Sequence, residues 1–197
     1  MNYLAHLYLA GDDPERRLGN ILGEFVRGPD LSAWSPGMAA GIRQHRAIDS
    51  YTDNHPLVGH SRARLAPEFR RYGGILLDMV YDHFLARHWD RWHDETLTDF
   101  AAQVYRELDQ YRGPQPGRMA EALAYMRRHD LLVAYRELPV LGRSLAGVGS
   151  RLTRDNPLHR ALPELERHYL ALEADFLAFF PELIRAHGPD AEPVTKK

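Results

Sequence analysis

LLDMVYDHFLARHW, residues 76–89, has the apolar content of one buried helix, yet it also carries two aspartates. Asp78 and Asp82 are four positions apart, so on a helix they share a face, and His83 lies beside the second aspartate. Unpaired carboxylates in apolar surroundings cost several kcal/mol each. The stretch therefore predicts a buried helix whose carboxylates are held by arginines, by backbone donors or by a metal ion.

The rest of the chain predicts an all-α fold around this helix. Its 197 residues are 44% hydrophobic and 26% charged, which suits one domain with a sizeable core. Strand signals are nearly absent, whereas helical spacing recurs. The predicted helices cover residues 14–27, 36–52, 56–71 and 74–92, a segment from Thr96 or Thr98 to about 113, and residues 116–134, 137–149 and 158–180, with Pro181 ending or kinking the last. Ser35 is the predicted cap of the second of these helices, and Thr96 or Thr98 that of the fifth. We expect a single-domain helical bundle over residues 1–187 and a flexible C-terminal tail over residues 188–197.

Several classes of protein are disfavoured by composition and by missing motifs. The absence of cysteine excludes disulfides, zinc–thiolate sites and thiol nucleophiles. The N-terminal stretch has no basic leader, and no apolar run reaches the roughly 18 residues of a membrane helix, so we expect a cytoplasmic protein without membrane contact. A net charge of −2 argues against a general nucleic-acid binder. No Gly-rich phosphate loop, Gly-x-Ser-x-Gly or His-Glu-x-x-His motif is present, which disfavours nucleotide-cofactor enzymes and serine hydrolases.

A second group of polar residues lies in GIRQHRAIDSYTDNHP, residues 41–56. His45 and Asp49 are four positions apart and share a helical face, and Asp53 extends the row by one turn. Imidazole and carboxylate suit manganese, magnesium, iron or zinc, and two helices of this kind make a metal cradle in a helical bundle. Taken alone, His45 and Asp49 also fit an ordinary surface pair.

LGNILGEFVRG, residues 18–28, and the apolar N-terminal stretch add further candidates. Glu24 fits either a metal ligand or a general base, but also an internal ion pair with Arg27 or Arg46. His6 lies within NYLAHLYLA, and a lone histidine on an apolar face is more often a core residue.

Taken together, MNYLAHLYLA, GNILGEFVRG, GIRQHRAIDSYTD and LLDMVYDHFLARHW resemble, in order and spacing, the motifs of the acyl carrier protein phosphodiesterases. These bacterial enzymes are regarded as divergent relatives of the metal-dependent HD phosphohydrolases. The resemblance is strongest over residues 1–92 and continues more loosely to about residue 185. It implies an HD-phosphohydrolase-like helical fold and a divalent cation, with manganese the expected ion and magnesium or iron(II) as alternatives.

The resemblance also implies the reaction. The substrate would be holo-acyl carrier protein, and hydrolysis would cut the phosphodiester between 4′-phosphopantetheine and the carrier serine. The chain departs from the family in one motif, because Glu24 stands where the pattern Gly-Asn-x-x-x-Asp-Phe has aspartate. HD domains are named after a His-Asp dipeptide, whereas this chain has Asp82-His83 in the reverse order. The metal-ligand assignments of ordinary HD domains therefore cannot be carried over directly.

On this basis we expect the metal to be held by His45, Asp49, Asp82 and His83, with Asp78 as a ligand or as an orienting residue. Glu24 would take the proton of the attacking water or complete the shell. Arg46 or Arg27 would stabilise the phosphoryl oxygens, and His6 would protonate the leaving serine oxygen.

Because carrier proteins are acidic, we expect a positive surface beside the site. The candidate substrate-binding residues are Arg16, Arg17, Arg43, Arg70 and Arg71. Two alternatives stay open: a related metal-dependent phosphohydrolase acting on a nucleotide or small phosphodiester, and a non-enzymatic helical module binding an acidic protein. The sequence leaves the oligomeric state and the acyl-chain preference undetermined.

Overall fold

The computed structural model describes residues 1–189 and 191, and over these residues the regular structure is entirely helical. The N-terminal half contains α1 (Tyr3–Leu9), α2 (Pro14–Gly23), α3 (Pro36–Asn54), α4 (Pro56–Arg64), α5 (Pro67–Arg70), α6 (Gly73–Arg87) and the 3-10 turn η1 (Trp89–Arg91). The C-terminal half contains α7 (Leu97–Gln110), α8 (Met119–Arg128), α9 (Leu131–Ala134), α10 (Leu138–Gly149), the 3-10 turn η2 (Leu158–Arg160), α11 (Leu162–Arg167) and α12 (Tyr169–His187). The predicted all-α, single-domain fold is confirmed.

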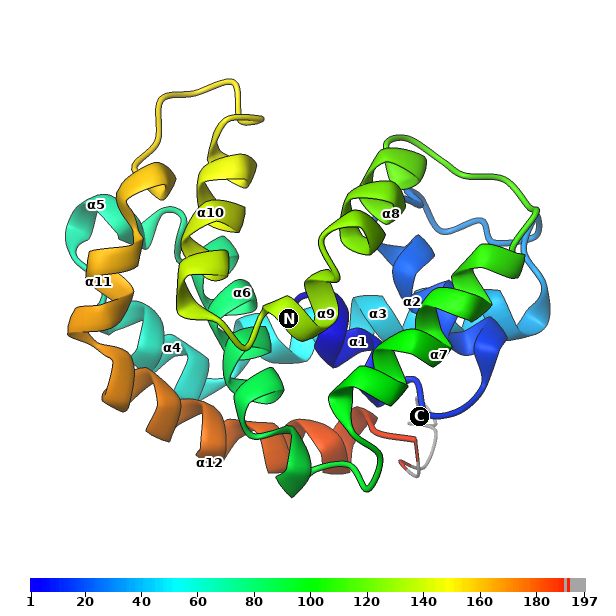
Figure 1. Ribbon diagram of the computed structural model, residues 1–197, viewed down its shortest axis with the longest axis horizontal. Coiled ribbons are helices and arrows are strands. Elements are labelled where there is room, and N and C mark those ends of the chain that lie inside the picture. Colours follow the sequence, from blue (N-terminus) through cyan, green and yellow to red (C-terminus); the bar gives the residue numbers. More distant parts are fainter. Residues whose placement is uncertain (190, 192–197) are drawn as a thin grey trace.

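The helices form two groups joined through the middle of the molecule (Figure 1). The view shows α4, α5, α10 and α11 on one side and α2, α7 and α8 on the other, with α1, α3 and α9 towards the centre. The helix that contains residues 76–87 is α6, and its Leu76, Leu77, Val80 and Phe84 are almost fully buried. The apolar side chains of α6 therefore belong to the core, as its composition predicts.

Local capping explains where several helices begin and end. Ser35 and Thr96 cap α3 and α7 with their side chains, as predicted from the sequence. The predicted helix 56–71 is interrupted, because Pro67 requires the extended conformation that Ala66 adopts before it. The predicted helix 116–134 is likewise divided, because Asp130 adopts a left-handed conformation with φ of 43° between α8 and α9.

Two further differences concern the ends of the chain. The helix α1 was not among the predicted segments, and it is too short for apolar periodicity to reveal it. Pro181 lies inside α12, which continues to His187 instead of ending. Most of the predicted flexible tail, residues 190 and 192–197, lies outside the described residues. Within the described part of the chain, no helix has the length and apolar content needed to span a membrane.

The close pairing of α2 with α3 positions the candidate site. A Cβ atom at Gly19 would lie 2.2 Å from the carbonyl oxygen of Met38, and one at Gly41 would lie 2.3 Å from that of Arg16. Both glycines therefore allow the two backbones to touch. This contact brings the C-terminal end of α2 against the middle of α3, where His45 and Asp49 lie.

Candidate metal site

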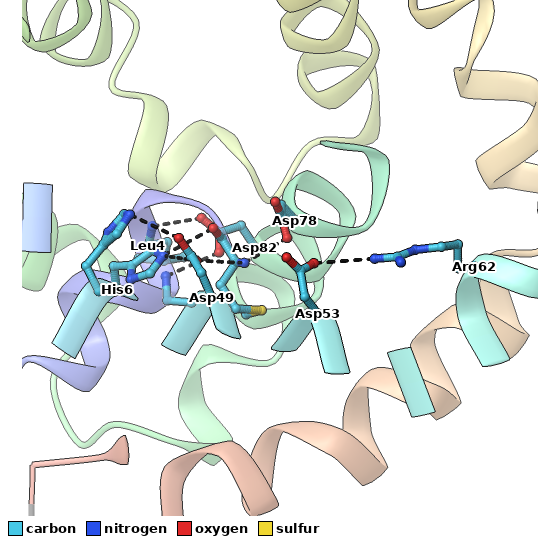
Figure 2. Close-up of polar contacts among 10 residues, drawn as sticks. Leu4, His6, Asp49, Asp53, Arg62, Asp78 and Asp82 are labelled. Atoms are coloured by element: carbon cyan, nitrogen blue, oxygen red, sulfur yellow. Dashed lines mark hydrogen bonds and ion pairs between the residues drawn. The ribbon is translucent and has the colours of Figure 1, made fainter. Parts of the chain in front are cut away.

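Two histidines and one aspartate from two helices meet in one cluster, of which Figure 2 labels His6 and Asp49. The Nε2 atom of His6, from α1, lies 3.1 Å from Oδ1 of Asp49, and Nε2 of His45 lies 3.1 Å from Oδ2 of the same carboxylate. Ligand atoms of the three residues all lie within 4.8 Å of one another. The imidazole rings stack with centroids 4.0 Å apart. This cluster has the donor types of a two-histidine, one-carboxylate metal site.

The helices impose this geometry on the three side chains. His45 and Asp49 are one turn apart on α3, as their spacing predicts. Gly23, at the end of α2, leaves room for the His45 ring, since a Cβ there would lie 2.4 Å from the ring Cγ atom. This role of Gly23 was not predicted from the sequence. Its signal was the four-residue spacing from Gly19, which places both glycines on the face of α2 that meets α3.

Two of the three donors, His6 and Asp49, have protonation states that suit a cation. Burial lowers the pKa of His6 to about 4, so its ring is neutral near pH 7. Burial raises the pKa of Asp49, but the hydrogen bonds from His45 and His6 outweigh burial, and the net pKa is well below its usual range. The Nδ1 atoms of both rings are buried and have no hydrogen-bond partner in the described part of the chain. The residues present fit a divalent cation, with one neutral imidazole and one ionised carboxylate already established.

A pocket of about 390 Å³ opens beside the cluster. Its lining includes five residues predicted from the sequence to belong to the site, namely Glu24, Arg27, His45, Arg46 and Asp49. Arg46 donates a hydrogen bond to the carbonyl oxygen of Val26 at 3.1 Å, which ties α3 to the turn after α2. The pocket therefore combines the candidate ligands with two guanidinium groups and a second carboxylate.

Glu24 lines this pocket and stands at the C-cap position of α2. The residue as a whole is exposed, but its carboxyl is partly shielded from solvent. Partial burial of the carboxyl raises the pKa of Glu24, with Asp49 and Asp78 adding to the increase and His45 and Arg27 opposing it. A raised pKa makes the carboxylate a stronger base.

Asp78 lies next to the cluster but has another partner. Its Oδ1 atom is 2.7 Å from the amino group of Met1, and that nitrogen is 3.8 Å from Oδ1 of Asp49. Asp53, one turn beyond Asp49, points away from the cluster and pairs with Arg62 at 3.4 Å (Figure 2). Asp78 is therefore brought near the site, whereas Asp53 is not.

The structure does not bring Asp82 and His83 into the pocket. The fully buried Asp82 carboxylate accepts hydrogen bonds from the backbone N–H groups of Leu4 and Ala5, so both its oxygens are engaged. The two ring nitrogens of His83 contact the carbonyl oxygen of Tyr135 at 2.7 Å and the hydroxyl of Tyr169 at 2.8 Å. We therefore leave both residues out of the ligand set. His6, expected to be an acid, takes their place beside His45 and Asp49.

The candidate substrate-binding arginines do not form one surface. Arg17 is 2% exposed, and its guanidinium contacts Glu107, Asp12 and the carbonyl oxygen of Gly11. Arg17 is thus a structural residue that joins α2 to α7. The remaining four candidates are more accessible: Arg43, Arg70 and Arg71 are exposed, and Arg16 is half-buried. Arg70 and Arg71 lie at and after α5, at the opposite end of the longest axis from α2 (Figure 1).

A helical protein with two histidines and an aspartate clustered beside a pocket that also contains two arginines has donor types found in metal-dependent hydrolases. The family model of acyl carrier protein phosphodiesterases matches residues 1–183. The chain therefore belongs to the acyl carrier protein phosphodiesterase family.

Curated relatives can be aligned with the chain over nearly its whole length. The acyl carrier protein phosphodiesterase of Serratia proteamaculans is 39% identical over 186 residues, covering 94% of this chain and 96% of the relative. That of Yersinia pestis is 38% identical over the same shares. That of Escherichia coli O157:H7 is 36% identical over 185 residues, covering 93% of this chain and 96% of the relative. No solved structure matches the chain, so the expected likeness to HD phosphohydrolases stays a prediction.

Proposed function

We propose that this chain is a cytoplasmic phosphodiesterase that removes 4′-phosphopantetheine from holo-acyl carrier protein. One water is added across the bond between phosphorus and the carrier serine oxygen, leaving a serine hydroxyl and a phosphomonoester. The main support is the convergence of His6, His45 and Asp49 on one point beside a pocket with two arginines. Family membership supports the identity of the substrate.

The proposed metal ligands are His6, His45 and Asp49. A divalent cation bound there, with manganese the expected ion, supplies positive charge for the phosphoryl oxygens and lowers the pKa of a water molecule. Asp49 contributes charge, and the two imidazoles contribute neutral donors, so the site keeps a net positive charge when the ion is bound. Asp78 lies close enough to serve as an orienting residue.

The pocket residues have complementary roles. Glu24 accepts the proton of the attacking water, because burial raises its pKa and it lines the same pocket as Asp49. Arg27 and Arg46 stabilise the phosphoryl oxygens through N–H donors. Arg46 is the more firmly placed of the two, since one of its donors is fixed on Val26. Glutamate at position 24 reaches one methylene further than aspartate, which suits a residue that acts on water beside the cation.

The carrier protein would approach from the open side of this pocket. Of the arginines predicted to bind it, Arg43 lies one turn before Arg46 on α3 and is exposed. We therefore propose Arg43 as a contact for the acidic carrier, with an effect mainly on encounter rate and salt sensitivity. The buried Arg17 has no such role.

The test is incubation of the purified protein with holo-carrier and manganese, followed by mass spectrometry of the carrier. Loss of the prosthetic group by wild type, but not by Asp49→Asn, is the expected result. An intact holo-carrier with rapid hydrolysis of an aryl phosphodiester would favour a small-molecule phosphohydrolase. No hydrolysis of either substrate, together with no bound metal, would favour the non-enzymatic helical module.

A further inference from the structure

The fully buried carboxylate of Asp82 is not part of the proposed chemistry, yet it contacts the helix that carries His6. Its Oδ2 atom lies 2.7 Å from the backbone nitrogen of Leu4, and Oδ1 lies 3.2 Å from that of Ala5. Leu4 and Ala5 are the second and third residues of α1. Their N–H groups are the ones that a capping side chain normally binds at the start of a helix.

No local side chain performs this function for α1. Asn2 stands at the capping position but makes no capping hydrogen bond, and its Nδ2 atom donates to the hydroxyl of Tyr135 at 2.7 Å. The cap comes instead from α6, 78 positions away from Leu4 in the chain. A local cap would stabilise the helix equally well, but only a cap from another helix also fixes where α1 lies relative to that helix.

The position of α1 determines the position of His6. His6 follows Ala5 directly, and its side chain must extend to Oδ1 of Asp49 on α3. The helix has only seven residues, so a shift at its first turn moves His6 with it. The two hydrogen bonds to Asp82 thus connect α6 to the candidate ligand cluster without adding a ligand to it.

We propose that Asp82 is a positioning residue, which caps α1 from α6 and thereby sets where the His6 imidazole meets His45 and Asp49. This also accounts for the second of the two carboxylates in the apolar stretch 76–89. The metal-binding part of the following test rests on the proposed function, whereas the part on metal-free protein does not.

The first measurement records the imidazole nitrogen signals of His6 and His45 by NMR in metal-free, full-length protein. Asp82→Asn keeps the size of the side chain but replaces one acceptor by a donor facing a backbone N–H. We expect both imidazole signals to shift. Asp175→Asn is the matched control, because Asp175 is another buried aspartate but binds Ser61 and Arg64 on α4. It should leave both signals unchanged.

The second measurement is manganese affinity by isothermal titration. Loss of an outer residue that orients a ligand weakens metal binding by about 10- to 100-fold, and this is the range expected for Asp82→Asn. The double variant Asp82→Asn with Asn2→Asp places a charged, acceptor-only side chain at the local capping position. We expect it to recover thermal stability but neither the affinity nor the imidazole signals.

Each other outcome is informative. A lower melting temperature with unchanged signals and affinity would make Asp82 merely structural, as would full recovery in the double variant. Loss of manganese as complete as in Asp49→Asn, with the imidazole signals in place, would make Asp82 a ligand. If Asp82→Asn does not fold, Asp82→Glu keeps the charge, and it must still shift the signals. If wild type binds no manganese, the proposed metal site fails, and the metal-free NMR comparison alone decides the role of Asp82.

Discussion

The rings of His6 and His45 stack at a centroid distance of 4.0 Å, although one histidine comes from α1 and the other from α3. Their Nε2 atoms contact opposite oxygens of the same Asp49 carboxylate. His6 is neutral and does not compensate the negative charge of the ionised Asp49 carboxylate. A divalent cation bound between them would supply that positive charge. The predictions below test this cluster and its supports.

Removing the charge of Asp49 should abolish metal binding. We expect Asp49→Asn to lose manganese binding and carrier hydrolysis together, while its helix content by circular dichroism stays near that of wild type. Asp53→Asn is the matched control, since Asp53 lies one turn further on α3 but pairs with Arg62. Equal losses in both variants would show that the overall negative charge of α3, rather than the His6–His45–Asp49 cluster, attracts the ion.

A methyl group at Gly23 should displace His45. The added Cβ would lie 2.4 Å from the His45 ring, so the ring must move. Misplacing a catalytic group by about 1 Å costs roughly 100-fold in rate, and we expect a loss of that order in kcat/KM for Gly23→Ala. Gly59→Ala, on α4, is the control because a Cβ there meets nothing within 4 Å. Wild-type activity in Gly23→Ala would contradict the role given to His45.

Two arginines predicted to bind the carrier should now behave differently. Arg17→Met removes a buried guanidinium from Glu107 and Gly11, so we expect about 3 kcal/mol of destabilisation in urea denaturation and little change in KM. Arg43→Ala should instead leave stability unchanged and raise KM for the carrier by no more than about fivefold, with reduced salt dependence. The reverse pattern would show that Arg17, rather than Arg43, contacts the carrier.

Titration of two buried groups should change the free energy of unfolding with pH in opposite directions. The pKa of His6 is lowered from 6.5 to about 4 in the folded protein. Its contribution to the free energy of unfolding is therefore complete above pH 6.5, the pKa in the unfolded chain, and is lost as the pH falls towards 4. Burial raises the pKa of Asp82 from 3.8 to about 7, so its contribution is present at low pH and is lost as pH rises towards 7.

The Asp82→Asn variant separates these effects in metal-free protein. Because the variant lacks the Asp82 titration, the difference in unfolding free energy between wild type and variant should be larger near pH 5 than near pH 7.5. Urea denaturation at the two pH values measures it. A difference that is the same at both values would show that Asp82 does not titrate in this range.

The fold was largely predictable because its signals are local. Ser35, Thr96 and the apolar face of α6 depend on residues within one or two turns, and these features were predicted correctly. The division of the helix at Pro67 was missed although its signal is local, and α1 was missed because seven residues carry too little periodicity.

The site was predictable only in part because its contacts are not local. The spacing of His45 and Asp49 reveals their shared face, and they remain candidate ligands. The same spacing in Asp78 and Asp82 suggested a second metal-binding helix, but the amino group of Met1 and the backbone of Leu4 and Ala5 engage these carboxylates. Composition does not show which carboxylate meets a histidine and which meets a helix end.

The most direct test of the central claim is an anomalous-scattering map from crystals of the protein grown with manganese. The account predicts one peak in bonding contact with His6, His45 and the Asp49 carboxylate, and no such peak in Asp49→Asn. A peak bound by Asp82 and His83, or no peak at the His6–His45–Asp49 cluster at saturating manganese, would contradict it.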